Sequence, residues 1–179
     1  MGPELIVALN GPPHVGKDTL GDRIALMRDD VGLFKFAQPL HEAAEAFGHG
    51  DKEAVGWSGM TGRQFRIWLS EEVFKPRFGS DVFGSILAGR LTSAAPTSRV
   101  AVITDCGFFD ELDKVAAQLP LKRIILVRLI RDKLTFAGDS RDYVRDHPVA
   151  WWETVDLHLQ TGQEAADARR LNGIIEEGL

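Results

Sequence analysis

The fold is decided by a stretch near the N-terminus, Leu5-Ile6-Val7-Ala8-Leu9-Asn10-Gly11-Pro12-Pro13-His14-Val15-Gly16-Lys17-Asp18-Thr19-Leu20. Residues 5–9 form a continuous apolar run, which is typical of a strand buried on both faces. Residues 11–17 fit the pattern G-x-x-x-x-G-K, and apolar side chains at 20, 24 and 27 follow at helical spacing. The strand, loop and helix together predict a phosphate-binding loop, because glycines let main-chain N–H groups curl around a phosphate at a helix N-terminus.

Within this loop, Lys17 has the clearest expected role, since its ammonium can reach the β- and γ-phosphates of a nucleotide and stabilise charge during transfer. The Ser or Thr that usually follows the lysine is replaced by Asp18, and Thr19 comes one position later. Either residue could hold Mg²⁺, Asp18 through a water. Alternatively, Asp18 caps the helix and Thr19 contacts a phosphate. The other expected nucleotide contacts are Gly11, Pro13, His14, Val15 and Gly16. A glycine turn that merely carries a lysine is the structural alternative.

Strands and helices alternate along the rest of the chain. Apolar runs predict further strands at 33–36, 100–104, 123–129 and 153–159, and helical patterns occupy 38–47, 61–74, 108–119 and 163–177, with another helix starting near Ser80. This alternation predicts an α/β three-layer sandwich with a parallel sheet of about five strands, covered by helices on both sides. Ligands in such sheets bind beyond the carboxyl ends of the strands.

Composition limits the partners. The 179 residues carry 21 Lys and Arg against 26 Asp and Glu, a net charge of −5, which disfavours long nucleic acid as a partner. The single cysteine, Cys106, excludes an intrachain disulfide. The N-terminus lacks the features of a secretory signal, and no apolar stretch reaches the ~20 residues of a membrane span. We therefore expect a cytoplasmic protein without a membrane partner.

Gly11 to Thr19 resembles the adenylate-kinase form of the loop, in which the threonine is also second after the lysine. The closer resemblance is to phage-type deoxynucleoside monophosphate kinases, which often carry Gly-Lys-Asp-Thr. Residues 36–40, 63–81 and 136–143 resemble the same family. His14 departs from the adenylate-kinase pattern, which has glycine there.

The resemblance implies one P-loop kinase domain over residues 1–179, with an acceptor-binding insertion at about 36–95 and a lid at about 130–148. It implies ATP and Mg²⁺ as cofactors, a deoxynucleoside monophosphate as the small-molecule acceptor, and a homodimer. If the protein is phage-encoded, its compartment is the host cytoplasm.

Asp105 ends the apolar run 100–104, where P-loop proteins place the acidic residue that holds Mg²⁺ directly or through water. The alternative is a cap for the helix that starts near Phe108. Arginines supply the remaining expected charge stabilisation, because a guanidinium binds phosphate oxygens through two hydrogen bonds. Arg128 is an expected nucleotide contact, and Arg131 and Arg141 are expected catalytic residues with Lys17 and Asp105. A solvated charged face is the alternative for this cluster.

For the acceptor, Arg63 and Arg66 are three residues apart on a helix that begins with a Thr61–Gln64 capping box, so both lie on one face. We expect them to bind the acceptor's phosphate, unless they are ordinary surface charge. Lys75 lies at the end of that helix. The further candidates for acceptor binding are Phe36, Asp139 and Ser140.

Two other functions stay open. The first is a related kinase that phosphorylates a hydroxyl group of a metabolite or of a modified base in phage DNA. That reaction needs a carboxylate as general base, for which Asp18, Asp81 or Asp105 is available. The second is a nucleotide-binding switch that transfers nothing, although the chain lacks the N-K-x-D-type segment that selects guanine.

Overall fold

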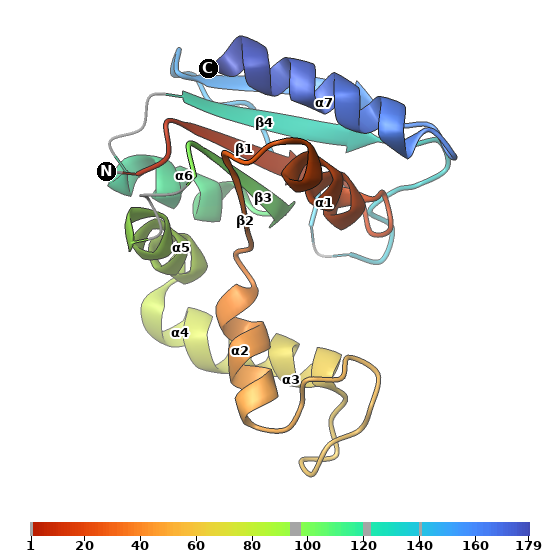
Figure 1. The fold of residues 1–179 in the computed structure, drawn as a ribbon. Helices are drawn as coiled ribbons and strands as arrows, with labels where there is room; N and C mark the ends of the chain where they lie inside the picture. The colour runs from red at the N-terminus through yellow and green to blue at the C-terminus, as the bar shows by residue number, and fades with distance from the viewer. Residues whose placement is uncertain (1, 94–97, 120–122, 140) are drawn as a thin grey trace.

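The computed structural model describes residues 2–93, 98–119, 123–139 and 141–179. Five strands form one sheet in the order β2-β3-β1-β4-β5, and every neighbouring pair is parallel (Figure 1). Their bounds are β1 Leu5–Asn10, β2 Val31–Phe34, β3 Val100–Cys106, β4 Arg123–Ile130 and β5 Trp152–His158. The predicted five-stranded α/β sheet is confirmed.

Helices cover both faces of the sheet, which makes three layers. On one face, α1 (Lys17–Met27) and α7 (Glu164–Gly178) bury residues such as Ile24 and Leu171 against β1, β4 and β5. On the other face, α5 (Val82–Ser93) and α6 (Phe109–Gln118) bury Leu87 and Leu112. Because β1, β3 and β4 lie between two apolar layers, their residues are almost all fully buried, as their continuous apolar sequences predict.

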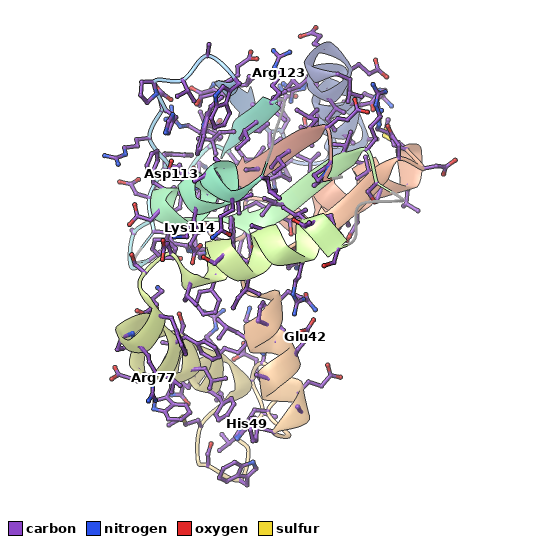
Figure 2. The ribbon with its side chains drawn as sticks, turned by 90° about the vertical axis from the view of Figure 1, so that its left-hand side faces the viewer. Glu42, His49, Arg77, Asp113, Lys114 and Arg123 are labelled. Atoms are coloured by element: carbon purple, nitrogen blue, oxygen red, sulfur yellow. The ribbon has the colours of Figure 1, made fainter. Side chains whose placement is uncertain are left out.

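A helical segment projects from the sheet between β2 and α5 (Figures 1 and 2). It holds α2 (Gln38–Ala46), a loop over residues 48–61, and a rod made of α3 (Gly62–Trp68), the π-helix η1 (Leu69–Phe74) and α4 (Lys75–Phe78). The expected capping box is present, since the Gln64 N–H donates to Thr61 Oγ1 at 3.2 Å and the Thr61 N–H to Gln64 Oε1 at 2.8 Å. We call this segment, residues 36–81, the acceptor half, after the acceptor-binding role that the sequence resemblance implies for it.

Two details differ from the sequence-based expectation. The strand β2 ends at Phe34 rather than Phe36, because the N–H groups of Phe36 and Ala37 donate to the Asp105 carboxylate and not to a neighbouring strand. The rod continues to Phe78, past the predicted helix end at residue 74. Pro76 occupies the first turn of α4, where its missing N–H matters little, and Gly79 then ends the rod with φ 96°.

The described residues between β4 and β5 form no helix or strand. Within the described part of the chain, every helix is too short or too polar to cross a bilayer.

Candidate phosphate-binding site

The loop after β1 has the backbone shape that its glycines predict. Gly16 has φ 108° and His14 has φ 63°, both in the left-handed region. Gly11 lies so close to β4 that an added Cβ would be 2.8 Å from the Leu129 carbonyl oxygen. Val15 is fully buried and holds the loop against the core, while His14 is exposed. The loop thereby leads directly from the buried strand β1 into the first turn of α1.

The Lys17 side chain folds back over this turn. Its Nζ donates to the carbonyl oxygens of Gly11 at 2.6 Å and Pro12 at 2.9 Å. Burial, followed by the nearby Arg141 guanidinium, lowers the pKa of Lys17 to about 8, although Asp18 and Asp105 oppose this. A partly desolvated ammonium gains more than an exposed one from an added anion, so a phosphate at this turn would be stabilised by Lys17.

Asp18 and Thr19, on the first turn of α1, have different surroundings. Asp18 Oδ1 accepts from Thr104 Oγ1 and pairs with Lys35 Nζ, both at 2.8 Å, which ties α1 to β3 and to the start of the acceptor half. Burial opposes ionisation of Asp18, but the hydrogen bonds from Lys35 and Thr104 outweigh it and lower the pKa. Thr19 is exposed on the first turn of α1.

Asp105 lies at the carboxyl end of β3, as expected, and both of its oxygens accept main-chain hydrogen bonds. The Phe36 N–H donates to Oδ1 at 2.8 Å and the Ala37 N–H to Oδ2 at 2.9 Å. Burial nevertheless raises the pKa of Asp105. The carboxylate therefore fixes the entry to the acceptor half. The Asp105 carboxylate also lies close enough to Lys17 to raise the pKa of that lysine.

No cluster of three or more His, Cys, Asp or Glu suited to a metal occurs within residues 2–93, 98–119, 123–139 and 141–179. Magnesium in phosphoryl-transfer sites needs only one or two protein oxygens, with the nucleotide and water supplying the rest. Asp18, Thr19 and Asp105 are the side chains by the loop that fit this limited role.

Three arginines beyond the loop differ in their surroundings. Arg131 follows β4 and reaches over Gly16, where its Nη2 would be 3.6 Å from an added Cβ, and its Nε is buried without a partner among the described residues. Arg141 crosses Gly107 and pairs with Asp139, a pairing that raises the pKa of Arg141 and lowers that of Asp139 to about 2. The structure therefore brings Arg131 and Arg141 to the loop.

Arg128 has a different position. Its Nε and Nη2 donate to the Val144 carbonyl oxygen at 2.9 and 2.7 Å, and Nη2 also pairs with Asp146 at 2.8 Å. The guanidinium thus holds the segment after β4 against the sheet, and the structure does not bring it to the loop.

Asn10 shares this task and was missed by sequence reasoning. It is fully buried at the end of β1, donates to the carbonyl oxygens of Cys106 and Asp142 at 3.0 and 3.3 Å, and accepts from the Val144 N–H at 2.9 Å. The second half of the predicted lid, from Asp142 on, is therefore tied to the core. A polar residue at the end of a buried apolar run was the available signal.

In the acceptor half, Arg63 and Arg66 lie together on α3 with no ion-pair partner among the described residues. Burial, and then the Arg63 charge, lowers the pKa of Arg66. His41 lies close by. Its pKa is lowered first by burial and then by the nearby charges of Arg66 and Lys35. We call Arg63 and Arg66 the cationic wall. Lys35, which pairs with Asp18 beside the loop, acts electrostatically on the same histidine.

The other predicted acceptor contacts are placed differently. Lys75 Nζ pairs with Glu71 at 2.7 Å and lies 4.7 Å from the centroid of the Phe108 ring. The Phe36 side chain is 2% exposed and packs in the core, so only its main chain faces the site. Asp139 pairs with Arg141. Ser140 lies outside the described residues.

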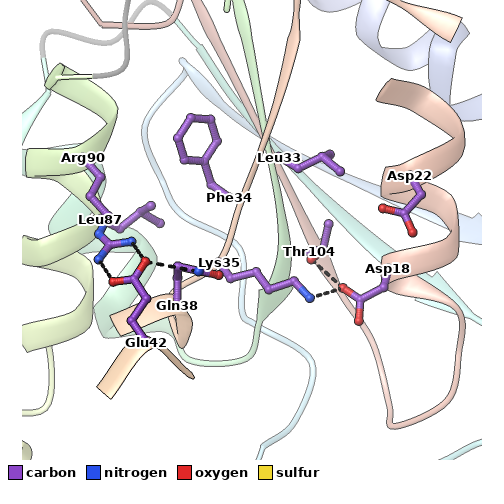
Figure 3. A pocket seen from close by; sticks show the side chains of 10 residues that line it. All are labelled: Asp18, Asp22, Leu33, Phe34, Lys35, Gln38, Glu42, Leu87, Arg90 and Thr104. Atoms are coloured by element: carbon purple, nitrogen blue, oxygen red, sulfur yellow. Dashed lines mark hydrogen bonds and ion pairs between the residues drawn. The ribbon is translucent and has the colours of Figure 1, made fainter. Parts of the chain in front are cut away.

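A cavity of about 510 Å³ borders the loop on the side of Asp18. Figure 3 shows Lys35 reaching across it to Asp18, with the Glu42–Arg90 ion pair on the opposite wall. Most of the charged side chains that line this cavity pair with one another. The cavity therefore lies between the loop and the acceptor half, but it offers few unpaired charges to a ligand.

No protein-family model matches the chain, and no curated protein matches it by sequence. Solved structures do resemble it. A protein from Chloroflexus aurantiacus J-10-fl, assigned provisionally as a kinase, has a TM-score of 0.54 at 15% identity, with 100% of each chain covered. The structure of APE1195 has a TM-score of 0.52 at 14% identity and covers 99% of this chain and 97% of its own. At these identities the likeness establishes the fold alone, a parallel α/β sheet covered by helices on both faces.

Proposed function

We propose that this protein transfers the γ-phosphoryl group of ATP to a deoxynucleoside 5′-monophosphate. The observation that carries the first part is the state of Lys17, a partly desolvated ammonium bent over the turn between β1 and α1. Arg131 and Arg141 approach the same turn from the segment after β4. Phosphoryl transfer requires such positioned positive charge more than any covalent chemistry by the protein.

ATP with Mg²⁺ is the proposed donor. The loop amides and Lys17 would hold the β- and γ-phosphates, and Asp18, Thr19 and Asp105 would hold the ion in part through water. The fold resemblance to a protein from C. aurantiacus assigned provisionally as a kinase agrees with this donor.

A monophosphate acceptor is favoured by the cationic wall. Arg63 and Arg66 have no ion-pair partner among the described residues; after burial, the Arg63 charge lowers the pKa of Arg66 and the Arg66 charge lowers that of His41, while Glu53 opposes the shift of Arg66. An arriving dianion would relieve this repulsion, whereas a neutral alcohol would not. A phosphate acceptor also requires no general base.

The test is a radiolabel transfer screen from ATP to the four deoxynucleoside monophosphates, the four ribonucleotides, simple hydroxyl metabolites and DNA that contains modified bases. We expect label in at least one deoxynucleoside diphosphate. Label only in a hydroxyl acceptor would overturn the substrate assignment, and nucleotide binding without any transfer would favour the switch.

A further inference from the structure

Gly107 lies buried in the turn between β3 and α6, and the Arg141 side chain passes directly over it. A Cβ added to Gly107 would overlap with Arg141 Cδ, and it would lie 3.0 Å from Cγ and 3.7 Å from Cβ. Two carbon atoms make their best contact at roughly 3.5–4.0 Å, so the first two approaches are too close. The arginine stem therefore occupies the space that any other residue at position 107 would fill.

The backbone conformation does not explain why position 107 is a glycine. The described glycines with a positive φ are at positions 16, 48, 59, 79, 138 and 162, and Gly107 is not one of them. An alanine can therefore adopt the same backbone conformation. The three atoms nearest to the added Cβ all belong to Arg141, so space for this one side chain is the specific requirement here.

The two chain segments that carry Gly107 and Arg141 are held together by Asn10, at the end of β1. Asn10 Nδ2 donates to the Cys106 carbonyl oxygen at 3.0 Å and to the Asp142 carbonyl oxygen at 3.3 Å. Cys106 and Asp142 are the direct neighbours of the two residues in contact. Since Asn10 is fully buried, separating the segments would leave its amide without partners, which opposes any movement that makes room for a Cβ.

The guanidinium at the end of the stem has its own restraint. Arg141 Nε donates to Asp139 Oδ1 at 2.8 Å and Nη2 donates to Oδ2 at 2.5 Å. The guanidinium lies close enough to Lys17 to lower the pKa of that ammonium, although burial has the larger effect. Asn10 thus fixes the main chain beside Arg141, Gly107 accommodates the stem, and Asp139 orients the head.

We propose that Gly107 is a positioning residue for phosphoryl transfer. The missing side chain of Gly107 leaves space for the Arg141 stem, and this space keeps the Arg141 guanidinium beside the phosphate-binding loop. A displacement of about 1 Å at a charge-stabilising group can cost roughly 10²-fold in rate, so the seat of this arginine matters for transfer. The proposal rests on the proposed function, because it takes Arg141 as a group that stabilises the transferred phosphoryl group.

The experiment compares the wild type, Gly107→Ala, Arg141→Ala and the double variant in steady-state transfer to the preferred deoxynucleoside monophosphate. Gly173→Ala is the matched control. It makes the same chemical change on α7, at a position where an added Cβ has open space.

We expect Gly107→Ala to lower kcat by about 10–100-fold while the acceptor KM stays within about threefold, because the displaced guanidinium no longer meets the charge of the transition state. Arg141→Ala should lower kcat at least as much. In the Arg141→Ala background the stem is gone, so adding Gly107→Ala should change kcat by less than about twofold. Gly173→Ala should behave as the wild type.

The arginine Nε–H signals in NMR spectra of the nucleotide-free protein give a readout that does not require transfer. In the wild type, the Arg141 Nε–H that donates to Asp139 should give a resolved signal, which is assigned by its loss in Arg141→Lys. Gly107→Ala should shift or remove this signal, whereas Gly173→Ala should leave it unchanged.

Thermal unfolding of the same variants identifies the origin of any strain. If the added methyl group lowers the melting temperature of Gly107→Ala, the double variant should match Arg141→Ala, because the obstructing stem has been removed. This recovery supports the proposal even where Gly107→Ala alone does not fold.

Any of three results would overturn the proposal. They are a wild-type kcat in Gly107→Ala, an unchanged Arg141 Nε–H signal in that variant, or equal losses of kcat or stability from Gly107→Ala with and without the Arg141 side chain. If the wild type phosphorylates no deoxynucleotide, the proposed function has failed instead, and the Nε–H spectra and the unfolding data still decide whether Gly107 positions Arg141.

Discussion

Under the proposed function, the phosphate-binding loop and the acceptor half would each bind an anion, and they are built for it in different ways. The loop is rigidly built, with Val15 in the core, a glycine packed against β4, and a lysine whose hydrogen bonds are already made to the loop's own carbonyl groups. The acceptor half holds Arg63 and Arg66 on a rod that is joined to the sheet through two short connections, and leaves them unpaired among the described residues. The loop is preorganised by its backbone, whereas the acceptor half relies on unbalanced charge.

The largest effect should come from Lys17→Ala, which removes the charge that the loop is built around. We expect transfer to fall by about 10²–10³-fold or more, because this ammonium acts on charge that shifts in the transition state. The melting temperature should change little, since the variant deletes a desolvated charge rather than a core contact. Turnover and thermal unfolding of one preparation test this, and near-normal turnover would contradict the site assignment.

A smaller effect, confined to the acceptor, should come from Arg66→Ala. We expect the acceptor KM to rise by roughly 10–100-fold, because the variant loses the free energy of a charge-assisted hydrogen bond to the acceptor's phosphate. The affinity for ADP should stay unchanged. Arg77→Ala is the matched control, because Arg77 is exposed on α4 of the same rod (Figure 2). Equal effects of the two substitutions would mean that the wall acts only through overall charge.

The smallest effect is a pH dependence of nucleotide binding. With the pKa of Lys17 at about 8, the free loop loses its ammonium as the pH rises above that value, and a bound phosphate favours the protonated form. ADP affinity should therefore be level below about pH 7.5 and decline by up to roughly tenfold per pH unit above 8.5. Calorimetric titration across this range measures it, and a flat profile would show that the lysine does not contact the phosphates.

The sheet and the loop were predictable from sequence because their signals are local. Continuous apolar runs define strands buried on both faces, and the G-x-x-x-x-G-K pattern needs only one turn of chain to be recognised. The Thr61–Gln64 cap was likewise read from residues three apart.

What could not be predicted depends on contacts between distant segments. Asn10 meets Asp142 and Val144 only after the sheet has formed, and Asp105 receives N–H groups from residues nearly 70 positions earlier in the chain. Arg128 has the sequence context of a phosphate ligand, yet Val144 and Asp146 occupy its guanidinium.

The π-helix η1 sets the angular phase of the rod. Arg66 and Lys75 are nine residues apart, about two and a half turns of regular α-helix, which would place them on opposite sides of the cylinder. A π-helical turn consumes more residues per revolution, so the same nine steps complete less rotation and bring the two cations round toward a common side. Deleting a single residue from Leu69–Phe74 would leave the two cations eight residues apart, about 800° of regular α-helix, so the rod could return to the α-helical repeat while both cations stay near a common side.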